Sequence, residues 1–146
     1  MSVSGSSLLS LGAALSALAA LAHIGVVLGG PDWYRFFGAG EGMARMAERG
    51  SVYPAVITLA IAAVLAVWSA YALSGAGHLP ALPWLKWILL AITAVYCLRG
   101  VAGFVLAGVA PGANGMAFWL WSSSICLLIG LIHVFGLRAA WSRLAL

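Results

Sequence analysis

Four long stretches of apolar residues, separated by short breaks rich in Pro, Gly and Asn, dominate the pattern of hydrophobic and polar positions in this chain. They cover residues 8–28, 52–73, 82–107 and 116–137. A membrane-spanning helix needs about 20 predominantly apolar residues, and each stretch is long enough to supply them. The pattern therefore predicts an all-α fold, an integral membrane four-helix bundle with both termini on one side of the membrane.

Residues 31–50, between the first two stretches, follow a different pattern. Their apolar and charged side chains segregate at helical spacing, which is typical of an amphipathic helix. Gly38, Gly40 and Gly42 are expected to break this helix into two short pieces, because glycine disfavours the interior of a helix. We predict an interfacial segment that lies on the bilayer and covers one mouth of the bundle.

The composition supports a single four-span domain over residues 1–146. Hydrophobic residues make up 64% of the chain and charged residues 7%, whereas a soluble domain has about 25% charged residues. The net charge of +4 comes from scattered basic residues, so the chain lacks the basic stripe that a nucleic-acid partner requires. We expect an integral membrane protein, in the inner membrane of a bacterium.

Basic residues near the span ends are divided evenly between the two faces, so they do not decide the orientation by number. They are Arg35, Arg45 and Arg49 in the first loop, and Lys86, Arg138 and Arg143 on the terminal side. The first loop also holds all three acidic residues, and the third loop holds no basic residue. We therefore expect both termini in the cytoplasm.

Aromatic residues gather near the ends of the apolar stretches. Rings with a polar edge collect at the level of the lipid headgroups, so this distribution favours two interfacial belts over an aromatic ligand cage.

Arg99 lies inside the third apolar stretch, where a charge at the centre of a helix costs at least about 2.5 kcal/mol. By helical rise it lies about 12 Å from the first-loop end of its span, and His23 lies about 9 Å from the same face. Glu41 or Asp32 supplies a carboxylate if the first loop folds down, and Tyr96 lies one turn before Arg99. We predict that these five residues bind a small anion or a lipid headgroup.

Two other interpretations remain open for these polar residues. Arg99 is alternatively a structural residue, which pins the loop through a salt bridge or extends to the interface unaided. Ser123, Cys126 and His133 form a second polar stripe on one face of the fourth span, where they serve helix packing or line an ion path. No Asp or Glu lies within the four spans, which argues against proton-coupled transport.

The cysteines and histidines predict no metal site and no cofactor. Cys97 and Cys126 lack the CxxC or Cys/His spacing of a redox motif or a zinc site. His23 and His133 lie near opposite faces, so they are poorly placed as two axial ligands of one haem. No nucleophile and base stand at a catalytic spacing, so we name no catalytic residue.

The sequence favours a small-ligand or lipid-headgroup binding or transport component, with a polar pocket under the first loop. An accessory or assembly subunit is the alternative, because the chain has two small-residue faces that can dock another helix. They are formed by Gly12, Ser16 and Ala20, and by Ala62, Ala66 and Ala70. A lipid-modifying enzyme, with His23 as acid or base, is the third possibility. The expected partners are the lipid bilayer, a small anion or lipid, and further copies or another membrane protein.

Overall fold

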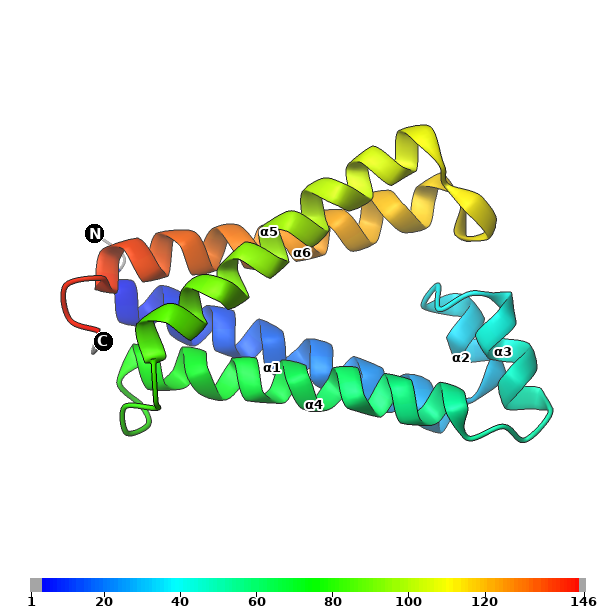
Figure 1. Ribbon diagram of the computed structural model, residues 1–146, viewed down its shortest axis with the longest axis horizontal. Coiled ribbons are helices and arrows are strands. Elements are labelled where there is room, and N and C mark those ends of the chain that lie inside the picture. Colours follow the sequence, from blue (N-terminus) through cyan, green and yellow to red (C-terminus); the bar gives the residue numbers. More distant parts are fainter. Residues whose placement is uncertain (1–3, 145–146) are drawn as a thin grey trace.

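The computed structural model describes residues 4–144, and every regular element in that part of the chain is helical (Figure 1). Four helices are long and apolar enough to cross a membrane: α1 (Gly5–Gly29), α4 (Tyr53–Ala76), α5 (Leu85–Val109) and α6 (Gly115–Ala140). They contain 24 to 26 residues, which corresponds to about 36–39 Å of helix. The predicted all-α architecture with four spans is confirmed.

The ends of these helices follow local chemistry. α1 begins before the predicted residue 8, because the Ser4 side chain accepts a hydrogen bond from the Ser7 N–H at 3.2 Å and caps the helix. α5 begins at Leu85, three residues later than predicted. Pro83 disfavours helical geometry in the residue before it, and Trp84 adopts a left-handed conformation with φ 49°.

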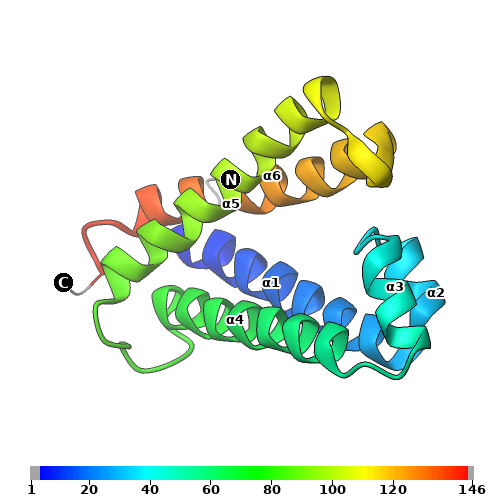
Figure 2. The ribbon, with the colours of Figure 1, turned by 45° about the vertical axis from the view of Figure 1, so that its right-hand side comes forward.

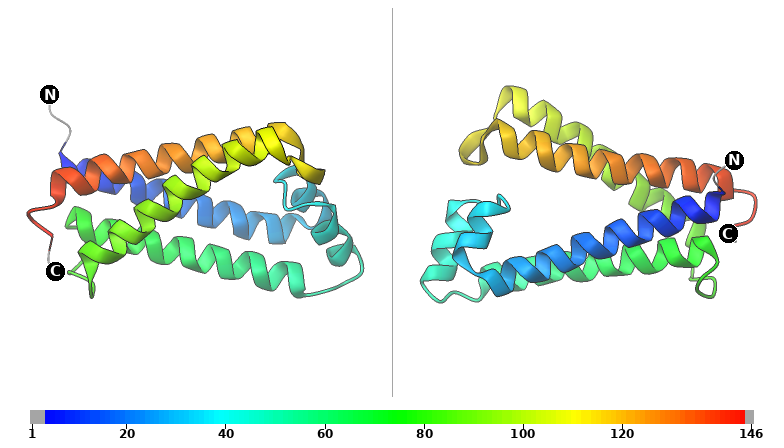
Figure 3. Two further views of the ribbon diagram at one scale, coloured as in Figure 1. Left: turned by 45° about the horizontal axis from the view of Figure 1, so that its top comes forward. Right: turned by 180° about the vertical axis from the view of Figure 1, so that it is seen from behind.

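The long helices form two antiparallel hairpins, α1 with α4 and α5 with α6 (Figures 1 and 2). α1 also packs against α6, whereas contacts between α4 and α5 are fewer. The hairpins meet at the end where α1 begins and α6 finishes, and they diverge toward the loop between α1 and α4 (Figure 3). The bundle therefore has a closed end and an open end.

Glycines bring α1 and α6 into direct contact at the closed end. A Cβ on Gly5 would lie 2.9 Å from the backbone nitrogen of Ala140, and a Cβ on Gly136 would lie 3.1 Å from the backbone nitrogen of Leu9. Neither position has room for a side chain, so the two backbones approach closely.

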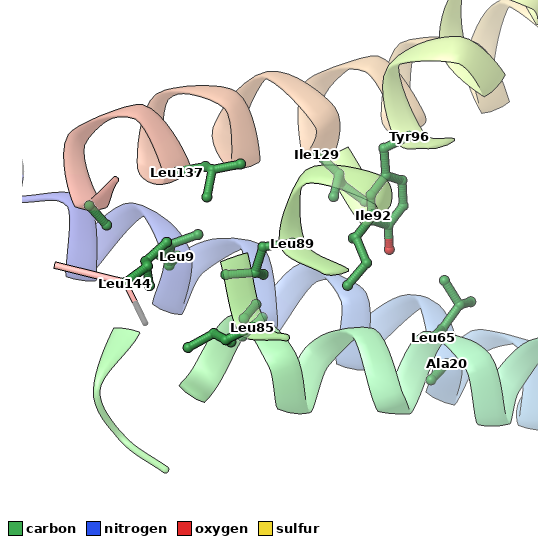
Figure 4. Packing of buried hydrophobic residues seen from close by; sticks show 13 residues of the cluster. Leu9, Ala20, Leu65, Leu85, Leu89, Ile92, Tyr96, Ile129, Leu137 and Leu144 are labelled. Atoms are coloured by element: carbon green, nitrogen blue, oxygen red, sulfur yellow. The ribbon is translucent and has the colours of Figure 1, made fainter. Parts of the chain in front are cut away.

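A cluster of buried apolar residues holds the closed half together (Figure 4). All four long helices contribute to it, for example Leu9 from α1, Leu65 from α4, Leu89 from α5 and Leu137 from α6. Leu9 and Leu89 have no exposed surface. The buried core thus fixes the crossing of the two hairpins near one membrane face.

The first loop folds at the open end as two short helices, α2 (Pro31–Phe36) and α3 (Glu41–Glu48). The chain turns between them at Gly38 and Gly40, whose φ values of 75° and 95° favour glycine. Gly42 lies inside α3, so its predicted role as a breaker is wrong. A small separate core ties this loop to the end of α1; its buried members are Val26, Tyr34 and Ala44.

Candidate functional site

A cavity of about 670 Å³ lies at the open end, between the first loop and the beginning of α6. The loop forms one wall, and η1 (Gly112–Asn114) with the first turns of α6 forms the other. In Figure 1 these walls are the cyan and the yellow to orange segments on the two sides of the opening. The lining residues are Arg35, Phe36, Phe37, Gly38, Gly40, Glu41, Asn114, Ala117, Phe118, Trp121, Ser122 and Ile125.

The cavity combines a mainly apolar and aromatic lining with a few polar groups. Arg35, Glu41 and Asn114 lie at the loop end, whereas Ser122 lies about two turns into α6. Cavities of about 300–1,000 Å³ with this mixture are typical of small-molecule sites. The arrangement suits a molecule with one polar end and one apolar end.

A second cavity, of about 300 Å³, adjoins the first. The two share Phe37, Gly38 and Phe118 as lining residues, and the second also reaches His23 and Thr58. An apolar chain that enters the larger cavity therefore has further space between the hairpins.

Phe118 of α6 lies against Gly38 of the first loop. A Cβ at Gly38 would overlap the Phe118 ring, so this contact depends on glycine at that position. The contact links the loop, which is attached to the α1–α4 hairpin, to the α5–α6 hairpin. It closes part of the opening between them.

The acidic residues of the first loop form an ion-pair network around Arg35. The guanidinium donates to Glu41 at 2.8 Å from Nε, to Glu48 at 2.7 Å from Nη2 and to Asp32 at 3.3 Å from Nη1. Arg35 Nη2 also donates to Glu41 at 3.1 Å, and Arg45 Nε donates to Glu41 at 3.0 Å. Arg35 thus contacts all three carboxylate side chains of the chain and joins α2 to α3.

The network holds Glu41 in its ionised form. Hydrogen bonds from Arg35 and then Arg45 lower the pKa of the Glu41 carboxyl from its ordinary 4.5 to about 2. The same pairing raises the pKa of Arg35. Glu41 therefore contributes a fixed, neutralised charge to the cavity wall and does not exchange protons near neutral pH.

Arg99 lies between α5 and α6, on the α6 side of the opening. Its Nη2 donates to the Ser122 hydroxyl at 3.3 Å, and its Cζ lies 5.1 Å from the centre of the Trp119 ring. Its Nη1 is buried and has no hydrogen-bond partner among the described residues. The guanidinium is therefore held by one hydroxyl and one aromatic face, which leaves part of its donor capacity unused.

Gly103 makes room for this side chain. A Cβ there would lie 2.6 Å from Arg99 Nη1 and would overlap Ser123 Oγ. Ser123 has no exposed surface, and its hydroxyl also lacks a partner in the described part of the chain. Two unpaired polar atoms thus lie beside the same glycine in the α5–α6 interface.

The five residues predicted to form one ligand site lie in separate places. Asp32 and Glu41 belong to the exposed ion-pair network, so the predicted pairing of either with Arg99 is not formed. The reason is that Arg35, on the same loop, takes both carboxylates. His23 lines the smaller cavity, where its Nδ1 lies 2.7 Å from the backbone carbonyl oxygen one turn earlier.

Tyr96 belongs to the buried core, where its hydroxyl lies 2.9 Å from Ser16 Oγ. Its ring lies 5.5 Å from the ring of His133, which has no exposed surface. His133 Nδ1 lies 2.9 Å from the Ile129 carbonyl oxygen, which only accepts, so Nδ1 carries the proton. These contacts bind α1, α5 and α6 together at mid-bundle and do not reach the larger cavity.

The second polar stripe lies along the inner part of α6. Ser123 and His133 are buried, and Cys126 is half-buried with a free thiol. No described residue joins them into a continuous hydrogen-bonded path. Their role as an ion path stays a prediction.

The α6 residues that line the cavity were not predicted, because the aromatic residues among them were assigned to an interfacial belt. Phe118, Ser122 and Ile125 recur at helical spacing, which places them on one face of that helix. The spacing is visible in the sequence, but it does not tell which helix or loop this face meets.

Within residues 4–144 no group of three or more His, Cys, Asp or Glu side chains is placed to hold a metal ion. The chain matches no protein-family model, no curated protein and no solved structure.

Proposed function

We propose that this protein is a ligand-binding or transport component of the membrane, and that it takes an amphipathic small molecule into the cavity under the first loop. The cavity of about 670 Å³ between the loop and α6 is the observation that carries this proposal. Its volume lies within the range of small-molecule sites, and it opens where the two hairpins diverge.

The distribution of charge supports an amphipathic ligand. The first loop holds six of the ten charged residues and belongs at the headgroup level, because charges are costly in the hydrocarbon core. Asn114 and Ser122 offer hydrogen-bond partners to the polar part of a ligand, and Phe118, Trp121 and Ile125 contact its apolar part.

The first loop serves as the cover of this site. The Arg35 network ties α2 to α3, and the contact between Gly38 and Phe118 closes one side of the opening. Separation of this contact widens the entrance without disturbing the buried core at the closed end.

We place the protein in the inner membrane of a bacterium with both termini in the cytoplasm, so the cavity opens toward the outer face. The terminal face carries Lys86, Arg138 and Arg143 without acidic neighbours in sequence, which supports this orientation. A cysteine introduced at Gly42, which is exposed, should react with an impermeant thiol reagent added outside. Reaction only after the membrane is opened would reverse the orientation.

The alternative, an accessory subunit, has support from a different surface. The face of α1 predicted for docking is used inside the chain: Gly12 abuts His133, and Ser16 bonds to Tyr96. A groove of about 470 Å³ along α1 and α4 remains available to a partner helix. Small residues such as Ala62 and Ala66 line it together with the larger Leu21, Ile24 and Leu59.

A cavity-filling substitution tests the proposed function. Ala117 is exposed and lines the cavity, so Ala117→Trp should fill it without disturbing the core. The purified protein is mixed with a monoacylglycerol, which has a neutral polar end, and bound molecules are counted by native mass spectrometry. Wild type should retain the lipid, and Ala117→Trp should lose most of it.

Ala102→Trp is the matched control, because Ala102 is exposed on α5 and lines none of the cavities described above. It should bind the monoacylglycerol as wild type does. Equal binding by all three proteins would contradict a site in this cavity. A second protein that stays bound in wild type and leaves the cavity empty would favour the accessory subunit.

A further inference from the structure

We propose that the α6 wall of the cavity recognises an oxyanion, the phosphate group of the ligand, through the Ser122 hydroxyl backed by the Arg99 guanidinium. This inference rests on the proposed function, because it names the chemical class of the ligand that the cavity holds. Ser122 is the residue that contacts the ligand, and Arg99 is a positioning residue that acts through it.

The charges of the chain leave Arg99 without a counterion. The chain has three carboxylate side chains, and all three are bound by Arg35 in the first loop. Within residues 4–144, Arg99 therefore has no ion pair, although it lies in a membrane-spanning helix. A positive charge in that setting is costly unless it is balanced, and an anionic ligand supplies the balance.

Ser122 connects the charge of Arg99 to the cavity, because its hydroxyl accepts a hydrogen bond from Arg99 and the residue lines the cavity. Arg99 Nη2 donates to Ser122 Oγ at 3.3 Å, so this oxygen already accepts a bond from a cation. The nearest internal acceptor for the Ser122 proton is the Trp119 carbonyl oxygen at 3.5 Å, which is a long contact. The hydroxyl is therefore available to donate to an acceptor in the cavity, and a negatively charged acceptor makes the stronger bond.

Two hydrogen-bond donors near Ser122 lack partners, which supports the assignment of an oxyanion site. Arg99 Nη1 and the fully buried Ser123 hydroxyl both lack partners among the described residues, and both lie beside Gly103. Polar atoms that are buried without partners are rare, because each costs free energy. A phosphate carries several acceptor oxygens, so it can take hydrogen bonds from more donors than the Ser122 hydroxyl alone.

The opposite wall does not repel an anion. Glu41 lines the cavity, but its two oxygens are bound by Arg35 and Arg45. The acids and the arginines of the first loop are equal in number, so the loop carries no net charge. The unbalanced charge near the cavity is that of Arg99, and it selects against a cationic ligand.

Two lipids that differ only in a phosphate group test this inference: a lysophosphatidic acid and the monoacylglycerol with the same acyl chain. Native mass spectrometry of wild-type protein with equal amounts of both should show a preference for the phosphate form of at least about tenfold, as expected for one hydrogen bond to a charged group. Ser122→Ala should lose this preference and still bind the monoacylglycerol. Arg99→Gln should do the same.

Two matched control variants separate recognition of the phosphate group from nonspecific attraction between charges. Ser124→Ala removes an exposed hydroxyl of the same helix that bonds only to its own helix backbone, so the preference should remain. Arg49→Gln removes an exposed positive charge on the same face and should also leave the preference intact. A preference lost equally in these two variants would assign it to nonspecific attraction and overturn the inference.

Added inorganic phosphate distinguishes the two sources of the anion. If inorganic phosphate abolishes the preference in wild type, the site binds free phosphate. If the preference persists, the site binds the phosphate of a lipid headgroup. Both results support an oxyanion site. Equal binding of the two lipids by wild type, or a preference that survives in Ser122→Ala and Arg99→Gln, would overturn this inference alone. Binding of neither lipid would overturn the proposed function as well.

Discussion

Single glycine residues decide how closely α5 and α6 approach each other and where polar side chains fit between them. In the α5–α6 hairpin, Gly103 lies beside Arg99 Nη1 and Ser123 Oγ, and Gly100 lies against the backbone of Leu127. The missing side chains let a guanidinium fit between two apolar helices. The Arg99 guanidinium therefore lies between α5 and α6, against Ser122 and Trp119.

Gly103→Ala should destabilise this hairpin, because the added Cβ overlaps Ser123 Oγ and crowds the guanidinium of Arg99. The expected loss is about 1–3 kcal/mol in the free energy of unfolding, measured by denaturant titration in detergent. Gly108→Ala in the same helix is the control, because nothing lies within 4 Å of a Cβ at that position. Equal stability of the two variants would show that Gly103 is not a close contact.

The sequence predicts the depth of Arg99 but not its surroundings. Helical rise is regular, so distances along one span can be counted from residue numbers. The direction of a side chain across the bundle depends on which helices pair. This is why the predicted partners Glu41 and Asp32 are wrong, and why Ser122 and Trp119, which come from the next helix, were not assigned to Arg99.

Among the helices, α2 and α3 form the proposed cover of the cavity, and Arg35 joins them. The guanidinium reaches Asp32 within α2, and Glu41 and Glu48 in α3. The predicted amphipathic segment over residues 31–50 folds as two helices with a glycine turn, in agreement with its sequence pattern. The ion-pair network inside it could not be predicted, because it depends on how the two short helices fold back on each other.

Arg35→Gln should loosen this cover and return the pKa of Glu41 from about 2 toward its ordinary 4.5. A carboxyl whose pKa is lowered by folding stabilises the fold above its unfolded pKa. The contribution of this pair is therefore present above about pH 4.5 and is lost as the pH falls toward 2. NMR titration of Glu41 and hydrogen exchange of the first-loop amides measure both effects.

Arg49→Gln is the control for the first loop, because Arg49 is exposed and its side chain makes no bond to the three carboxylates in the described structure. The pKa of Glu41 should stay low in this variant. A Glu41 pKa that is already ordinary in wild type would contradict the network itself.

In the molecule as a whole, packing of α1 against α6 is the main connection between the two hairpins. The buried cluster and the glycines at the closed end fix this contact, and the hairpins separate toward the first loop (Figures 1 and 3). Four spans with short connections are visible in the hydrophobic pattern. The divergence of the hairpins is not, because it depends on packing between residues far apart in the chain.

Photo-crosslinking shows where a ligand lies, and so tests whether it binds between the first loop and α6. A monoacylglycerol with a photoreactive acyl chain is bound to the wild-type protein in detergent, activated by light and located by peptide mass spectrometry. We expect crosslinks to concentrate in residues 35–41 and 114–125, and Ala117→Trp should remove them. Crosslinks spread evenly over the outer faces of α1, α4, α5 and α6, and unchanged in Ala117→Trp, would contradict it.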